Sequence, residues 1–281
     1  MAPGGPGSRG RPVPIRALRT GLLLVMLALP AGGQALTFDV RASNFTPAEV
    51  AVIEAAGALW EAPIRDPFVV EIDIEKRSLP GSVLAVSREF LAGIDGRPSQ
   101  GTVDIADLAG EPSGWFVDPT PTTSEEFEPG TYPWVSVAPD GGPAFAMLDL
   151  LTVVTHELGH VLGFAAAYPA LAAHLEPTPS GLRTFVGPNV TATFTAAGQG
   201  THLEGLAHPL DLMTSLSERG ERRTPSRVDL LVLADAFGYT VDPPPPFDGP
   251  PVEVPDSPSS VLLVSGLLLL ALVHRWRPTT S

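Results

Sequence analysis

The sequence has 281 residues, and residues 36–258 carry 31 acidic and 11 basic side chains, a formal charge of −20. This charge argues against nucleic acid as a partner, because phosphate binding depends on clustered lysine and arginine. Cysteine is absent, which excludes disulfides, thiolate metal ligands and a cysteine nucleophile.

The first 35 residues have the features of an export signal. Four arginines precede the apolar run GLLLVMLALP, and small residues that include Gly33 and Ala35 follow it. This order is typical of a signal peptide with a cleavage site after the small residues. The sequence therefore predicts an exported protein with a signal peptide over 1–35 and a mature chain that begins near Leu36.

One helix and three strands are the next predicted elements. Residues 45–62, FTPAEVAVIEAAGALWEA, combine a capping threonine, a proline at the first helical position and apolar residues at helical spacing, which predicts a helix. Residues 68–76 alternate between apolar and acidic side chains, as a half-buried strand does. Two further segments, 82–87 and 101–108, are weaker strand candidates.

Residues 109–143 are rich in proline, glycine and acidic residues, which predicts a long surface loop. The loop carries four aromatic residues: Trp115, Phe116, Tyr132 and Trp134. Acidic residues over 104–128 leave calcium binding open, although a solvated acidic loop explains them better.

A second, longer helix is predicted over 144–164, AFAMLDLLTVVTHELGHVLGF. Its residues are almost all apolar, so the helix should be buried on most sides, and Gly163 is a suitable end. Residues 164–201 predict irregular structure, and 224–239, TPSRVDLLVLADAFGY, predict a last helix. These elements together indicate one α+β domain over 36–242.

The C-terminal part has three segments. Residues 243–258 hold many prolines and predict a semi-rigid polyproline linker. The apolar run 261–273 would span about 20 Å as a helix, less than a bilayer core of roughly 30 Å, and basic residues follow it. Residues 259–281 therefore predict a sorting signal or a membrane anchor.

This C-terminal arrangement resembles the PEP-CTERM sorting signals of exopolysaccharide-forming bacteria. The chain has VPDSP where that family usually has a Val-Pro-Glu-Pro motif. The resemblance implies a sorting transpeptidase of the exosortase type as a partner, and contact with a membrane at least transiently. A plain C-terminal membrane anchor is the alternative.

The motif HELGH at 156–160 is the strongest chemical signal in the chain. His156 and His160 are four residues apart on a predicted helix, so both can face one metal ion. Glu157 lies beside them and can act as general base and acid toward a water molecule on the metal. Catalytic zinc normally has three protein ligands, and position 166, where a compact zinc protease has its third histidine, holds Ala166. The other histidines of the predicted domain are His174, His202 and His208, and spacing alone does not choose the third metal ligand among them.

The stretch from His156 to Phe164 resembles the zinc helix of the metzincin metalloproteases. Later motifs are similar to those of the leishmanolysin-like branch, which inserts a long loop before the third histidine. Their order here is FVGPNVTATF at 185–194, then THL around His202, then DLM ending at Met213, eleven residues further on. The resemblance implies that His202 is the third ligand and that Met213 forms the methionine turn beneath the metal. His208 stays the alternative third ligand.

The resemblance also implies a metzincin-like fold. A twisted sheet with helices would form an upper half, 36–163, and an irregular segment with a C-terminal helix would form a lower half, 164–242. The chain departs from this branch in lacking the cysteines that form its disulfides and its latency switch, and Leu203 replaces an aromatic residue. A tyrosine, either Tyr168 or Tyr239, could stabilise the oxyanion, although a packing role with a satisfied hydroxyl is more typical of both.

The combined hypothesis is an exported zinc endopeptidase of a bacterium that acts on proteins or peptides. It would reside at the cell surface, in the outer membrane or in the extracellular matrix; one lysine against 16 arginines favours a GC-rich bacterium. Two alternatives remain: a catalytically quiet surface or matrix binding protein with a metalloprotease-like domain, and a non-enzymatic domain in which a structural zinc ion binds His202 and His208 together.

Overall fold

The computed structural model describes residues 35–108, 114–197, 201–215 and 217–244. The predicted signal peptide, apart from Ala35, and the predicted segments beyond Pro244 lie outside these residues. None of the described helices is long and apolar enough to cross a membrane. The described chain has mixed α+β structure, with helices and several small sheets, as the sequence predicts.

A four-stranded sheet forms the first part of the domain, in the order β1-β2-β4-β3. Its strands are β1 (Thr37–Ser43), β2 (Val69–Arg77), β3 (Ala85–Ala92) and β4 (Pro98–Ala106). The first three in this order are parallel, whereas β3 runs antiparallel to β4 at the edge. Alternate residues of β2, Val70, Ile72 and Ile74, are buried in the core, which explains the apolar and acidic alternation of the sequence.

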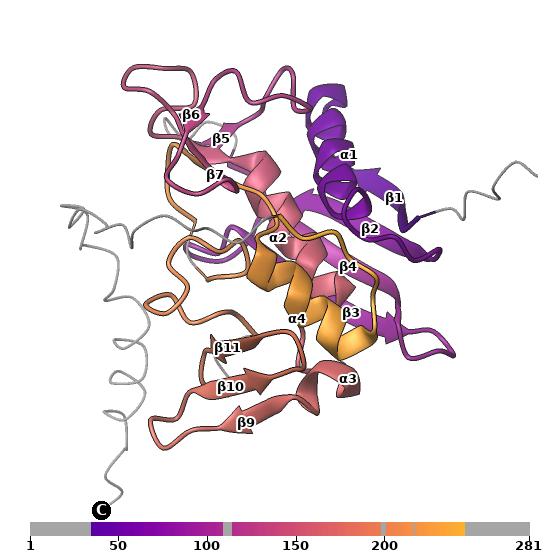
Figure 1. Cartoon of the computed structure of the whole chain (residues 1–281). Helices are drawn as coiled ribbons and strands as arrows, with labels where there is room; N and C mark the ends of the chain where they lie inside the picture. The colour runs from indigo at the N-terminus through magenta and orange to yellow at the C-terminus, as the bar shows by residue number, and fades with distance from the viewer. Residues whose placement is uncertain (1–34, 109–113, 198–200, 216, 245–281) are drawn as a thin grey trace, which may run out of the picture. The chain divides into compact units, whose positions relative to one another are not determined.

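Two helices lie side by side against this sheet (Figure 1). The first, α1 (Pro47–Glu61), begins at the predicted Thr46 with a capping box to Glu49. The second, α2 (Leu150–Leu162), packs so closely on β4 that a Cβ at Gly101 would lie 2.5 Å from Val161. A buried hydrogen bond of 2.8 Å from the Trp60 indole to the Thr155 carbonyl joins α1 to α2.

Helix α2 begins six residues later than the sequence predicts. Leu148 and Asp149 form a short strand, β8 (Leu148–Asp149), which pairs with β5 (Trp115–Phe116). The Asp149 carboxylate then accepts the Thr152 N–H and caps the helix, and the buried Arg222 guanidinium binds both carboxylate oxygens. The helix ends at Gly163, as predicted, where φ is 139°.

The predicted loop 109–143 contains strands that the sequence does not reveal. Besides β5 it holds β6 (Glu128–Pro129) and β7 (Val135–Val137), and β7 pairs on its other side with β12 (Glu221–Arg223). Strands of two or three residues are too short for a period-two pattern to be recognised.

The prediction of irregular structure over 164–201 is also wrong in part. After the short helix α3 (Pro169–Ala172), three strands form an antiparallel sheet: β9 (Leu175–Pro177), β10 (Arg183–Val186) and β11 (Thr191–Phe194). The last helix, α4 (Arg227–Phe237), lies above this sheet in Figure 1. Its Asp235 accepts the N–H groups of Asn189 and Val190 and so fixes the turn between β10 and β11.

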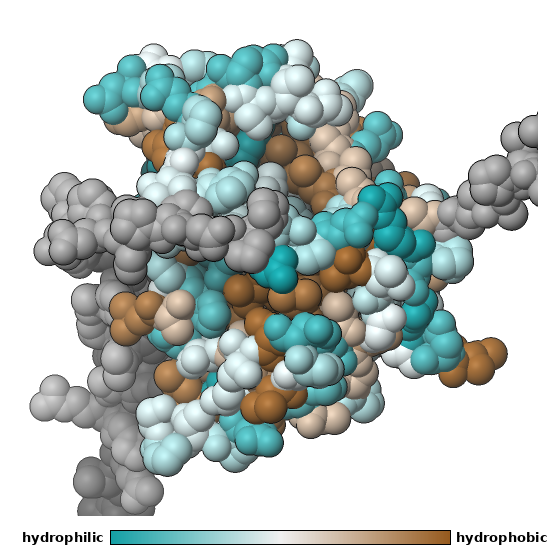
Figure 2. Space-filling model, in the orientation of Figure 1, coloured by the Kyte–Doolittle hydropathy of each residue, from teal (hydrophilic) through white to brown (hydrophobic). Residues whose placement is uncertain are grey.

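The visible face of the domain is mixed in polarity. Hydrophilic residues dominate its upper edge, whereas hydrophobic residues reach the surface in the middle of the face, over α4 and the neighbouring chain (Figure 2).

Candidate metal centre

Three histidine side chains converge between α2 and the chain that follows β11. His156 and His160 lie one turn apart on α2, and their Nε2 atoms are 3.1 Å apart. The Nε2 atom of His202 lies 3.1 Å from that of His160, and one ring nitrogen from each of the three histidines falls within 4.8 Å of the others. These three residues could hold a metal ion.

His202 reaches α2 because its segment is held on both sides by backbone hydrogen bonds. The Thr195 N–H donates to the His202 carbonyl at 3.0 Å, and the Leu203 N–H donates to the Met213 carbonyl at 2.9 Å. Leu203 also forms bridges to Phe194 and Thr214. The third histidine is therefore fixed between the end of β11 and the turn that contains Met213.

Backbone carbonyls orient the two helical histidines. His156 Nδ1 lies 2.8 Å from the Leu212 carbonyl, and His160 Nδ1 lies 2.7 Å from the Phe164 carbonyl. A carbonyl only accepts hydrogen bonds, so each Nδ1 is the protonated nitrogen and each Nε2 presents a lone pair to the cluster. This tautomer is the one that a metal ligand needs.

Burial keeps these imidazoles neutral. It lowers the pKa of His160 to about 4 and that of His156 well below its ordinary value, and the neighbouring imidazoles lower the pKa of His156 further. Tetrahedral zinc with Zn–N bonds of about 2.0–2.1 Å would place ligand nitrogens roughly 3.4 Å apart, close to the 3.1 Å spacings here. The donor set and its spacing therefore fit a metal ion, and imidazole suits zinc, copper, iron and nickel.

Met213 lies directly against the helix that carries the first two histidines. Its side chain is fully buried, and a Cβ at Gly159 of α2 would lie 2.4 Å from its sulfur. Only a glycine at position 159 allows this approach. The thioether thus packs against α2 at Gly159, and the Leu212 carbonyl of the same turn orients His156.

The carboxylate of Asp229 fixes that turn, and sequence reasoning missed this residue. Its oxygens accept the N–H groups of Leu212, Met213 and Ser226 at 3.1, 3.2 and 2.8 Å, and the residue is fully buried. Burial, together with the Asp211 carboxylate, raises the pKa of Asp229. The pattern Ser226-x-x-Asp229 predicts the capping box of α4, but nothing in the sequence indicates the contact with the methionine turn.

Glu157 is buried beside the histidines and contacts the edge strand of the sheet. Its Oε2 accepts a hydrogen bond of 2.6 Å from the hydroxyl of Ser87 on β3. Burial raises the pKa of Glu157 to about 7, and the hydrogen bond from Ser87 partly opposes that rise. A carboxyl group with a pKa near neutrality is suited to proton transfer at physiological pH.

The two other candidate histidines lie outside the cluster. His208 Nε2 accepts the Thr193 N–H at 3.1 Å, and its Nδ1 lies 3.0 Å from the Asp211 carboxylate. His174 is half-buried, stacks on Phe185 and donates to the Val186 carbonyl. Of the three candidates that spacing left open, the structure brings His202 alone to the helical pair.

Tyr168 and Tyr239 have their hydroxyls at the end of α2. These hydroxyls donate to the carbonyls of Val161 and Leu162 at 2.9 and 3.3 Å. The last carbonyls of a helix have no partner within it, so both tyrosines cap α2. Their hydrogen bonds favour the packing role that the sequence left open for them.

The acidic residues of 104–128 form no second metal cluster among the residues described. Two of them are instead bound to arginines: Asp104 to Arg88 and Asp118 to Arg222. No protein-family model matches this chain, and a search of curated proteins finds no match to it. The chemistry of the site is therefore argued from the residues themselves.

Proposed function

We propose that the chain is an exported zinc endopeptidase with a metzincin-like domain. The observation that carries this proposal is the convergence of three imidazole side chains, those of His156, His160 and His202. Glu157 follows the first of them on the same helix and has its own hydrogen-bond partner. Three histidines with an adjacent carboxylate are the groups that metal-assisted hydrolysis requires.

The residues have distinct roles in this proposal. His156, His160 and His202 would hold the zinc ion, which supplies Lewis acidity and lowers the pKa of a water molecule bound to it. Glu157 takes the proton of the attacking water and returns it to the amine that leaves. The Ser87 hydroxyl holds the Glu157 carboxyl in place before it accepts the proton.

The position of β3 at the edge of the sheet favours a peptide as the substrate. Among the described strands, β4 is the one that pairs with β3, so the other edge of β3 faces away from the sheet. An extended peptide can add to such an edge through backbone hydrogen bonds. Because Ser87 lies in β3 and contacts Glu157, a peptide along this edge would pass close to the general base.

The signals expected at the two ends of the sequence support an activity outside the cytoplasm. A signal peptide over 1–35 would direct export, and residues 259–281 would be read by an exosortase-type transpeptidase or would anchor the chain in a membrane. The enzyme would then act at the surface, in the outer membrane or in the extracellular matrix of a bacterium.

Both alternatives have less support. A catalytically quiet binding protein has no need for Glu157, yet this residue is present, buried and hydrogen-bonded to Ser87. A structural zinc site fills four positions with protein ligands, but His208 is engaged by Thr193 and Asp211 rather than by the cluster.

Cleavage of casein by the purified full chain tests the proposal. We expect cleavage that a chelator abolishes and zinc restores. We expect Glu157→Gln to keep its metal, measured by elemental analysis, and to lose at least about 100-fold in rate, since acid–base catalysis contributes about 10²–10⁴-fold. Equal cleavage by Glu157→Gln would contradict the hydrolase. A wild-type protein that binds zinc and cleaves no protein or peptide would favour the binding module.

A further inference from the structure

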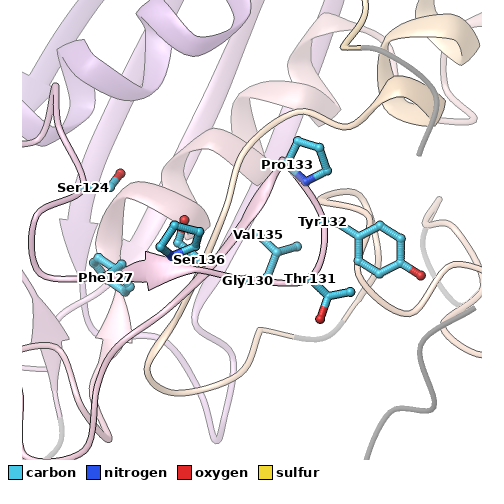
Figure 3. A pocket seen from close by; sticks show the side chains of 9 residues that line it. Ser124, Phe127, Gly130, Thr131, Tyr132, Pro133, Val135 and Ser136 are labelled. Carbon is cyan, nitrogen blue, oxygen red and sulfur yellow. The ribbon is translucent and has the colours of Figure 1, made fainter. Parts of the chain in front are cut away.

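A surface pocket of about 520 Å³ lies in the segment that carries β6 and β7, and the proposed reaction does not use it (Figure 3). None of its lining residues is charged: Ser124, Phe127, Pro129, Gly130, Thr131, Tyr132, Pro133, Val135 and Ser136. In Figure 3, Phe127 and Tyr132 lie at opposite ends of the pocket lining, with Gly130 and Val135 between them. The pocket thus combines two aromatic rings, two prolines and several hydroxyl groups.

Both aromatic rings are held in position by their neighbours. Tyr132 stacks on Trp134 with ring centroids 5.2 Å apart. Phe127 is buried, meets Phe116 edge-on, and has the Arg222 guanidinium 4.3 Å above its ring. Fixed aromatic surfaces of this kind bind proline-rich segments, because a polyproline helix is extended before it binds and loses little conformational entropy.

The chain contains such a segment directly after its described part. Residues 245–258, PPFDGPPVEVPDSP, hold six prolines among fourteen residues. The last described residue, Pro244, is connected to the pocket by two hydrogen bonds. The Arg227 guanidinium donates to the Pro244 carbonyl at 3.2 Å, and Thr224, three residues before Arg227, donates its N–H to the carbonyl of Trp134 at 2.9 Å. Trp134 is flanked by two residues that line the pocket.

The proline-rich segment is long enough to cover this separation. Three residue steps from Thr224 to Arg227 span at most about 11 Å, and an extended arginine side chain adds about 7 Å. The two hydrogen bonds, of 3.2 and 2.9 Å, bring the largest separation of Pro244 from Trp134 to about 24 Å. A polyproline helix rises about 3.1 Å per residue, so the eleven residues 245–255 would extend about 34 Å beyond Pro244. The sequence PPVEVP at 250–255 therefore comes within reach of the pocket.

We propose that residues 250–255 dock in the β6–β7 pocket of the same chain. The proposal does not depend on peptide hydrolysis. None of the residues that line the pocket has a role in the proposed reaction. The ligand that the pocket recognises is an extended, proline-containing segment, and the nearest one is tethered at Pro244.

Disulfide trapping tests this proposal, because the natural chain has no cysteine. The full chain in detergent would carry Thr131→Cys at the pocket and Val252→Cys in the proline-rich segment. The control pair combines Val252→Cys with Ala62→Cys, an exposed position next to Pro63, whose carbonyl accepts the Asp242 N–H. Both pairs share the same tether, and Ala62 lies beside Pro63, which contacts Asp242 near the start of that tether. Tethering alone therefore does not favour the pocket pair.

We expect an intramolecular disulfide to form at least about tenfold faster in the pocket pair, because docking raises the effective concentration of the two thiols. Pro250→Ser with Pro251→Ser, which leaves the pocket unchanged, should reduce that rate to the rate of the control pair. Equal rates for the two pairs would overturn the proposal. Faster disulfide formation between a Thr131→Cys chain and a separate Val252→Cys chain would also overturn it, because the occupant would then be a second copy.

Discussion

Each of the three histidines is oriented by backbone groups from a different part of the chain. The Leu212 carbonyl binds His156, the Phe164 carbonyl binds His160, and the peptide bonds around His202 are paired with β11 and with Met213. Partners of this kind fix the ring orientation and the tautomer of a metal ligand. The site is therefore organised by the fold before a metal binds.

His202 and His208 form a matched pair for testing the metal site. We expect His202→Ala to lose bound zinc, because it removes one of the three Nε2 donors. We expect His208→Ala to retain zinc but to unfold at lower temperature, because it leaves the partly buried Thr193 N–H without its acceptor. Elemental analysis and thermal unfolding of both variants check this. The opposite pattern of zinc loss would make His208 the third ligand.

The hydrogen bond from Ser87 to Glu157 predicts a shift in the pH profile. A donor to a carboxylate stabilises its charged form, so Ser87→Ala should raise the pKa of Glu157. The base must be deprotonated to act, so the acidic limb of the kcat/KM profile should move to higher pH. We expect the zinc content to stay at the wild-type level. An unchanged acidic limb would show that Ser87 does not act on the general base.

At the scale of elements, helix α4 supports the metal site without contributing a ligand to it. Asp229, in its first turn, binds the peptide N–H groups of Leu212 and Met213. The carbonyl groups of the same two residues then bind His156 and the segment of His202. One buried carboxylate thus connects a helix cap to two of the three ligands.

Asp229→Asn should weaken metal binding. An amide cannot accept hydrogen bonds on both sides, so a buried N–H loses its partner, at a cost of about 1–3 kcal/mol in unfolding free energy. Loss of an outer-shell partner lowers zinc affinity by about 10–100-fold. Competition with a chromogenic chelator measures that affinity.

The control for this variant is Asp235→Asn on the same helix. Asp235 also accepts backbone N–H groups, but those of the β10–β11 turn. We expect Asp235→Asn to bind zinc with wild-type affinity. An equal loss of affinity in the two variants would indicate general destabilisation rather than support of the methionine turn.

The sequence predicts well those helices whose ends are marked by residues close to them in the chain. The capping residues Thr46 and Ser226 and the terminal Gly163 mark ends of helices through contacts within a few residues. Strands β5 to β12 are only two to four residues long, and their pairing depends on distant partners. The start of α2 was predicted too early because the apolar run continues through β8, and the cap at Asp149 interrupts it.

The residues of the candidate site also differ in how well the sequence predicts them. HELGH lies on one helix, so its geometry follows from the helical period. The approach of His202 depends on β11 and on the Met213 turn, and no spacing rule contains those contacts. The resemblance to a known protease branch pointed to His202, and the contact of Asp229 with the turn could be found only in three dimensions.

At the scale of the whole molecule, a bound metal would join two parts of the chain that are far apart in sequence. His156 and His160 belong to the helix packed on the four-stranded sheet, whereas His202 follows the small sheet of the second part. An ion held by all three would oppose separation of these parts. The chain has no disulfide to do this, so metal binding should contribute to global stability.

Thermal unfolding with and without zinc measures this contribution. A ligand at 100 times its dissociation constant stabilises the folded state by about 2.7 kcal/mol. For a domain of this size each kcal/mol raises Tm by about 2–4 °C, so zinc should raise the Tm of the wild-type chain by about 5–10 °C. A chelator should remove the increase, and His202→Ala should show almost none. A similar increase in His202→Ala would mean that zinc stabilises the protein at another site, and the three histidines would then not be the residues through which a metal links the two parts of the fold.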